Sequence, residues 1–187
     1  MAPNRPLEVT MTALIPCVGC GALVPDIDGP THRYIGASPG CWQAYGELLA
    51  RGLVLEGDTP GYGPAHRFVV DTYTAQHPGV PGKQSSQSVA AHLFVLCLVL
   101  ERGVGPAFAT RAITQFVEKH KGRGLTWMEP PPSLGELTVL DVMSADSAKD
   151  HASQVIRWAE SVWRAWKPHQ SKVRAWADEF DQKSAHK

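Results

Sequence analysis

The sequence has no long hydrophobic run and no excess of charge of either sign. Its longest apolar stretch, from Leu93 to Leu100, is far shorter than the roughly 20 residues that a helix needs to cross a bilayer. The 187 residues include 18 basic and 18 acidic side chains, so their formal charges cancel. Such a chain is not expected to hold nucleic acid or an anionic membrane by general electrostatic attraction. We therefore expect a partner that is a small molecule or another protein.

Several familiar sequence signals are also missing. Pro3, Pro6 and Glu8 interrupt the beginning of the chain, which is unlike the apolar core of a secretory signal, and we expect a cytoplasmic protein. The sequence contains no P-loop, no GxGxxG and no HExxH, the patterns of nucleotide-binding loops and of many zinc proteases. The function must therefore be inferred from less familiar groupings of residues.

The composition is that of a folded protein. Hydrophobic residues make up 43 % of the chain, which is an ordinary share, and 187 residues correspond to roughly one domain. We predict a single helical domain over residues 13–180, made of a metal-binding knuckle over 16–41 and a helical bundle over 42–180. Residues 1–12 are predicted to be a flexible lead, and residues 181–187 a frayed tail.

Apolar residues recur at helical spacing along most of the chain, and no convincing run alternates as in a strand. The fold class is therefore predicted to be all-α, or nearly so. The spacing predicts helices over residues 42–55, 65–76, 87–102, 106–120, 147–166 and 173–180, with a short helix beginning at Thr138. Pro78 disfavours helical backbone at His77 and so ends the second of these helices. The third is apolar nearly all round, which predicts that it lies in the middle of the bundle.

The sharpest local signal is a cysteine knuckle in the loop-rich N-terminal segment. Cys17 and Cys20 form a CxxC in a glycine-bearing turn, which is the first half of many structural zinc sites. Cys41 supplies a third sulfur, and His32 lies between the CxxC and Cys41. We predict that Cys17, Cys20, His32 and Cys41 form a closed zinc site. This segment is predicted to consist of loops and tight turns rather than helix or sheet.

Histidines on the predicted helices give alternatives for the fourth ligand. His66 and His77 are eleven residues apart, about 16 Å along a straight helix, so they cannot share one ion. His92 lies on the next helix. If the two helices form an antiparallel hairpin, His92 comes level with residues 66–73 and faces the first helix. Any of these three histidines would be an alternative to His32 at the cysteines.

The same helices carry the candidates for a second site. His92 begins an otherwise apolar helix, so it needs a polar partner if it is buried. Asp71 and Tyr73 lie on the first helix, within the span that His92 is expected to reach. We expect His66 and His92 to share one ion, water or ligand, with His77 further along. Such a group would form a second metal or acid–base site unless it completes the cysteine site.

Four stretches of the sequence resemble an uncharacterised bacterial family, a domain of unknown function. They read CxxCGA, DGPTHxYIGASPGCW, HRxxxDxYxxQHPG and QSVxxH, and begin at Cys17, Asp28, His66 and Gln87. The resemblance covers most of residues 17–176. It implies that the polar residues of these motifs act together, and it implies no reaction.

These observations favour a small bacterial metal-binding protein, with zinc as the expected cofactor. One alternative is a metal-dependent hydrolase or related enzyme whose pocket is lined by His66, His77, His92, Asp71 and Tyr73. Another is a non-catalytic interaction module in which the zinc is structural. A closed site of four protein ligands would favour a structural ion, whereas three ligands and a water would favour catalysis.

Overall fold

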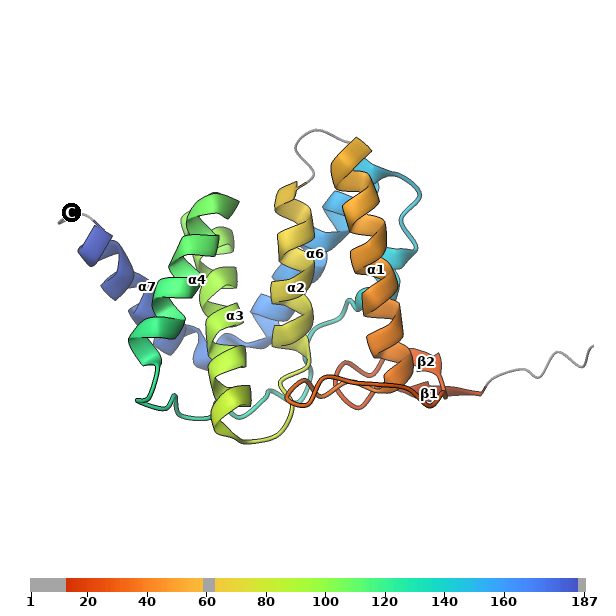
Figure 1. Ribbon diagram of the computed structural model, residues 1–187, viewed down its shortest axis with the longest axis horizontal. Helices are drawn as coiled ribbons and strands as arrows, with labels where there is room; N and C mark the ends of the chain where they lie inside the picture. Colours follow the sequence, from red (N-terminus) through yellow and green to blue (C-terminus); the bar gives the residue numbers. More distant parts are fainter. Residues whose placement is uncertain (1–12, 59–62, 185–187) are drawn as a thin grey trace, which may run out of the picture.

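The computed structural model describes residues 13–58 and 63–184, without the side chains of residues 56–58, 63, 64, 66, 106 and 181–184. Two short strands precede a set of helices in these residues (Figure 1). The elements are β1 (Leu14–Pro16), β2 (Leu23–Pro25), α1 (Pro39–Asp58), α2 (Gly63–Gln76), α3 (Lys83–Arg102), α4 (Pro106–His120), α5 (Val139–Met143), α6 (Ala148–Ala165), a 3-10 turn (Lys167–His169) and α7 (Gln170–Ser184). The predicted fold class, nearly all-α with a cysteine cluster near the N-terminus, is confirmed.

The helix boundaries follow the capping signals of the sequence. Helix α2 ends at Gln76, directly before His77 and Pro78, as the proline predicts. The short helix α5 begins after Thr138, whose backbone N–H donates to Asp141 Oδ2 at 2.7 Å in a capping box. Helix α7 continues to Ser184, while residues 1–12 and 185–187, where a flexible lead and part of a frayed tail were expected, lie outside the described residues. None of the described helices is both long enough and apolar enough to span a membrane.

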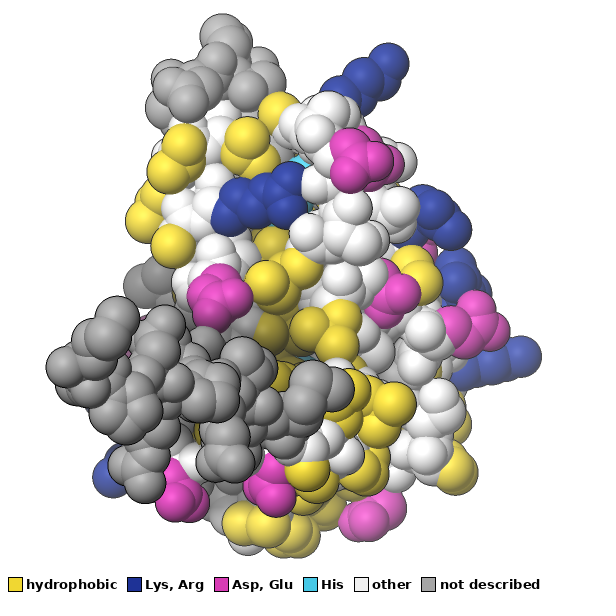
Figure 2. Space-filling view, turned by 90° about the vertical axis from the view of Figure 1, so that its right-hand side faces the viewer, with side chains coloured by type: hydrophobic (Ala, Val, Ile, Leu, Met, Phe, Trp, Pro, Cys, Tyr) yellow, Lys and Arg dark blue, Asp and Glu magenta, His cyan; other side chains and the backbone are white. Residues whose placement is uncertain are grey.

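The knuckle segment differs from the prediction in two ways. It contains an antiparallel hairpin in which Ile15 pairs with Val24, so the expectation that it holds no sheet is wrong. Its last residues begin α1 at Pro39, which places Cys41 in the first turn of a helix. The sequence pattern does not reveal the strands, because each has only three residues and carries apolar side chains on both faces, so apolar and polar residues do not alternate. Val24 is buried, whereas Leu14 and Leu23 are more than half exposed. Figure 2, which views the molecule from the right-hand side of Figure 1, shows several groups of hydrophobic side chains on that face.

Helix α3 occupies the centre of the helical layer, as its apolar sequence predicts. It packs against α2 on one side and α4 on the other, and it also contacts α6 and α7 (Figure 1). Leu93, Phe94 and Leu96 are completely buried. Helices α2 and α3 run antiparallel, joined by a short loop, so the predicted hairpin is confirmed.

The C-terminal end of α2 is held by tryptophans of α6. The Trp158 indole N–H donates to Gln76 Oε1 at 2.9 Å, and the Trp166 indole N–H donates to the Ala75 carbonyl at 3.0 Å. The Gln76 amide donates in turn to the carbonyls of Leu134 and Leu137, at 3.1 and 2.7 Å. All of this side chain's polar atoms are thus used inside the protein. The network fixes the position at which the chain leaves α2 for His77.

Replacing Gln76 by Ala should lower the free energy of unfolding by roughly 2–4 kcal/mol, because the buried indole N–H and two carbonyls lose their partner. Urea denaturation measures the change. Gln115→Ala, on the exposed side of α4, is the matched control and should change the stability by less than about 0.5 kcal/mol. Equal effects of the two substitutions would contradict the role of this network.

Candidate metal centre

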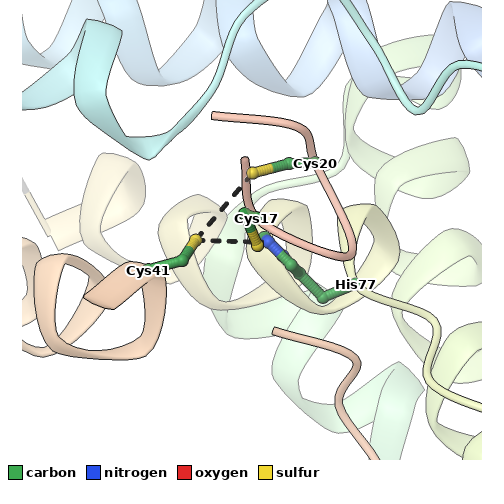
Figure 3. A group of neighbouring side chains, drawn as sticks. All are labelled: Cys17, Cys20, Cys41 and His77. Carbon is green, nitrogen blue, oxygen red and sulfur yellow. Dashed lines mark hydrogen bonds between the residues drawn. The ribbon is translucent and has the colours of Figure 1, made fainter. Parts of the chain in front are cut away.

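Four side chains from three separate segments meet at the base of the hairpin. Cys17 and Cys20 lie in the turn between β1 and β2, Cys41 lies in the first turn of α1, and His77 directly follows α2. Their ligand atoms all lie within 4.8 Å of one another, and the side chains point toward a common centre (Figure 3). Cys20 Sγ is 3.8 Å from Cys41 Sγ, and Cys41 Sγ is 3.4 Å from His77 Nε2. The cluster could therefore hold a metal ion.

These separations fit the edges of a zinc tetrahedron. Bonds of about 2.3 Å to sulfur and about 2.0 Å to nitrogen place two sulfurs about 3.8 Å apart, and a sulfur and a nitrogen about 3.5 Å apart. The Cys20–Cys41 and Cys41–His77 pairs match these values. Cys17, Cys41 and His77 are buried and Cys20 is half-buried. Three sulfurs and one imidazole form a ligand set that is typical of closed structural zinc sites.

The His77 ring is oriented for metal binding before any ion is considered. Its Nδ1–H donates to the Tyr73 carbonyl at 2.8 Å, because a carbonyl oxygen can only accept. In the neutral ring this bond leaves the lone pair on Nε2, which faces the sulfurs. The ring also stacks on Tyr73, with centroids 4.0 Å apart. A hydrogen bond from the second ring nitrogen is the usual way in which a protein orients a metal-binding histidine.

Two hydrogen bonds reach the sulfurs from outside the cluster. The Ser38 backbone N–H donates to Cys17 Sγ, and the Tyr73 hydroxyl donates to Cys41 Sγ, each at 3.5 Å. Both bonds favour the thiolate form, because a donor stabilises the negative charge on sulfur. The Ser38 hydroxyl accepts from the Val18 backbone N–H at 3.1 Å, which ties the CxxC turn to the start of α1.

Ser38 also lies in the sequence Gly-Ala-Ser-Pro-Gly, from Gly36 to Gly40, which matches the GxSxG pattern of serine hydrolases. In those enzymes the serine stands exposed on a sharp turn between a strand and a helix. Here Ser38 is buried and its oxygen is engaged by the CxxC turn. The segment that precedes it from residue 26 to residue 38 is not a strand. The structure thus gives this serine a role in holding the knuckle.

The electrostatics of the cluster call for a cation. Hydrogen bonds from the Cys20 and Cys41 thiols hold the pKa of Cys17 far below its usual range, whereas the nearby Cys17 and Cys20 sulfurs and burial raise the pKa of Cys41. A negative charge on Cys17 is therefore favoured, and a further one on Cys41 is resisted. Burial alone would lower the pKa of His77, but hydrogen bonds to Cys17 and Cys20 raise it to about 9. A divalent ion would allow all three sulfurs to be thiolates.

Gly19, inside the CxxC, permits the closest contact of the knuckle. A Cβ atom on this residue would lie 2.3 Å from the Gly36 carbonyl oxygen and 2.5 Å from His77 Cδ2. Both distances are far below van der Waals contact, so any larger residue would push the turn away from the imidazole. The absence of a side chain at Gly19 is therefore a condition for Cys17 and Cys20 to reach His77.

The sequence analysis named Cys17, Cys20 and Cys41, with His32 as the first choice for the fourth residue and His77 among the alternatives. The structure brings Cys17, Cys20 and Cys41 together with His77, which was an alternative, and not with His32. The His32 ring instead contacts Tyr34 edge-on at 4.1 Å and lies 5.8 Å from the Trp42 ring. The cause is a backbone hydrogen bond from Gly36 N–H to the His77 carbonyl, at 3.1 Å, which brings the end of α2 to the knuckle. The His77-Pro78 step, where the helix must end, was the available signal.

The residues that were expected to form a second polar site lie in two different places. Asp71 is completely buried, and its Oδ1 lies 2.7 Å from His92 Nδ1, so His92 faces α2 as predicted. The other carboxylate oxygen lies 3.4 Å from Arg67 Nε. His77 belongs to the cysteine cluster, and Tyr73 lies beside it and donates its hydroxyl to Cys41 Sγ. The side chain of His66 lies outside the described residues, so its expected meeting with His92 stays a prediction.

Fold and site together define a mostly helical protein with an N-terminal hairpin and a Cys3His cluster that could hold a metal ion. Residues 15–167 match the family of unknown function DUF5946, and the chain belongs to this family. The resemblance noted from the four motifs is thereby confirmed, and all four cluster residues lie within the matched range. Neither the search of curated proteins nor the search of solved structures found a match.

Gly19→Ala should weaken zinc binding by about 10- to 100-fold, the usual effect of disturbing the groups that orient a metal ligand. The cause is the clash of the new Cβ with the His77 ring. Competition with a chromophoric chelator measures the affinity. In the control, Gly46→Ala on α1, the new Cβ meets nothing within 4 Å, so zinc affinity should be unchanged. Unaltered affinity in the Gly19 variant would show that the close contact is unimportant.

Proposed function

We propose that the protein binds one zinc ion per chain through Cys17, Cys20, Cys41 and His77, and that this ion is structural. The observation that carries the proposal is the convergence of three sulfurs and one imidazole nitrogen within 4.8 Å. The bond from His77 Nδ1 to the Tyr73 carbonyl supports it, since it aims the free nitrogen at the sulfurs.

The donor set favours zinc over other common ions. Thiolates are soft ligands and select zinc, copper(I) or iron–sulfur clusters, whereas calcium and magnesium prefer oxygen. The cluster contains no carboxylate. A closed tetrahedron of three thiolates and one imidazole is a recurrent structural zinc site. Zinc also has no redox chemistry of its own, which suits an ion whose role is to hold the chain.

The closed geometry favours a structural ion over a catalytic one. Four protein ligands fill a tetrahedron, and a catalytic zinc needs an open position for water or substrate. Asp71 and His92, which were candidates for acid–base work, pair with each other rather than with a cluster residue. Among the alternatives considered, the non-catalytic module with a structural zinc therefore agrees best with the geometry, and the metal-dependent hydrolase least.

As a structural ion, the zinc would connect three separate segments of the chain. Strands of three residues cannot form a stable hairpin alone. An ion bound by the hairpin turn, by the start of α1 and by the residue after α2 would join all three. Structural zinc sites contribute on the order of 10 kcal/mol, enough to fold a segment with little core of its own.

The proposal predicts about one zinc per chain in the purified protein, lost in Cys41→Ser and His77→Gln. Two matched variants are the controls. Cys97→Ser changes a buried thiol on α3, whose pKa is raised to about 11 by burial and by Glu101, and His32→Gln changes the histidine outside the cluster. Both should retain the zinc. Metal analysis and thermal unfolding of all four variants measure the outcome. Full zinc in His77→Gln, together with loss in His32→Gln, would contradict the assignment.

A further inference from the structure

We propose that the N-terminus of α3 forms a binding site for a phosphate group, separate from the metal centre. An open pocket of about 400 Å³ lies there, lined by Arg33 and Tyr34 on one side and by residues 80–85 on the other. The lining includes the end of the loop after α2 and the first turn of α3, and this first turn is at the lower end of α3 in Figure 1. Its chemistry is that of an anion site in three respects.

The first respect is the supply of free backbone donors. Helix α3 begins at Lys83, and the first bond at its N-terminus runs from the Ser86 N–H to the Gly82 carbonyl, at 2.9 Å. The N–H groups of Lys83, Gln84 and Ser85 have no carbonyl partner within the helix. Gly82 occupies the N-cap and supplies no capping side chain. These donors and the helix dipole favour an anion in front of the helix.

The second respect is the hydroxyl of Ser85, a nearly buried residue that lines the pocket. Ser85 is only 4 % exposed, and within the described part of the chain its side chain has no hydrogen-bond partner. Because no described group of the protein uses this hydroxyl, it is available to a ligand that enters the pocket. Ser85 would donate its hydroxyl proton to an oxygen of the bound anion.

The third respect is the placement of positive charge. Arg33 and Lys83 both line the pocket, and no carboxylate pairs with either of them among the described residues. The first turn of α3 carries no acidic residue. A lysine at a helix N-terminus is unfavourable by itself, because the helix dipole is positive there. An anion relieves the repulsion among the two cations and the dipole.

The number and charge of the donors match a phosphate group better than a carboxylate. Two cations suit a group with nearly two negative charges, and three amides, a hydroxyl and a guanidinium can serve three phosphate oxygens. Tyr34, Val80 and Pro81 add apolar wall to the same pocket. The pocket therefore accepts either free phosphate or the phosphate group of a small molecule whose remainder contacts this wall.

The test is a titration of the isotope-labelled protein with inorganic phosphate, phenyl phosphate or acetate. The zinc content of the protein is measured beforehand. Amide chemical shifts are followed at constant ionic strength, adjusted with chloride. Saturable shifts of the Lys83, Gln84 and Ser85 amides are expected with both phosphates. Tighter binding of phenyl phosphate would indicate a phosphorylated small molecule as the natural ligand, and equal binding would indicate free phosphate. Absence of saturable shifts, or acetate binding as tight as phosphate, would overturn the proposal.

Three variants and two controls assign the effect to the pocket. Arg33→Gln and Lys83→Gln should each weaken phosphate binding about tenfold, because each removes a charged donor. Ser85→Ala should weaken it about threefold to tenfold. Ser86→Ala, at the neighbouring buried serine outside the pocket lining, and Lys149→Gln, at the start of α6, should leave it unchanged. Equal affinity in all five variants would overturn the site even if the wild-type shifts saturate.

Discussion

The N-terminal part of the fold depends on where His77 Nε2 points. Three sulfurs from the hairpin turn and from α1 converge on this nitrogen, and Nδ1 is held by the Tyr73 carbonyl one turn earlier. Because Pro78 follows, His77 is the first residue outside α2, so its ring can lie across the end of the helix. The tryptophans of α6 hold Ala75 and Gln76. The bundle thus positions the imidazole, and the imidazole positions the knuckle.

A series of stacked aromatic rings joins α1 and α2 beside the cluster. The rings of Tyr45 and Tyr73 stack with centroids 3.9 Å apart, and Tyr73 stacks in turn on His77. The Trp42 ring, next to Cys41 in α1, lies 5.9 Å from that of Tyr73. Aromatic pairs of this kind add stability beyond their buried area. Burial, aided by the charge of Asp71, raises the pKa of Tyr45 to about 12, so this ring stays neutral in the stack. Cys41 in α1 and His77 at the end of α2 are therefore both next to this stacked aromatic interface.

Most of the fold could be predicted because its signals are local. Pro78 and the Thr138–Asp141 capping box each mark a helix end within a few residues, and the apolar surface of α3 indicates a central helix. The hairpin could not be predicted, because three-residue strands with apolar side chains on both faces leave no alternation to detect. The pairing of His92 with Asp71 was within reach, since a short loop between two helices dictates their antiparallel packing.

The fourth cluster residue required information that spacing does not contain. His32 is close to the cysteines in sequence, whereas His77 follows Cys41 by 36 positions. His77 lies at the cysteines because of the hydrogen bond between Gly36 and His77 and because of the close approach of Gly19 to the His77 ring. Both are tertiary contacts. The cysteines were easier, because two of them share one turn and the third had no competing partner nearby.

X-ray absorption at the zinc edge of the purified, zinc-loaded protein tests the central claim most directly. The account predicts three sulfur neighbours at about 2.3 Å and one imidazole nitrogen at about 2.0–2.1 Å, with no oxygen in the first shell. His77→Gln should remove the imidazole signal from any zinc that remains bound, and His32→Gln should preserve it. A first shell with a water oxygen, with fewer than three sulfurs, or with an imidazole that survives in His77→Gln would contradict the account.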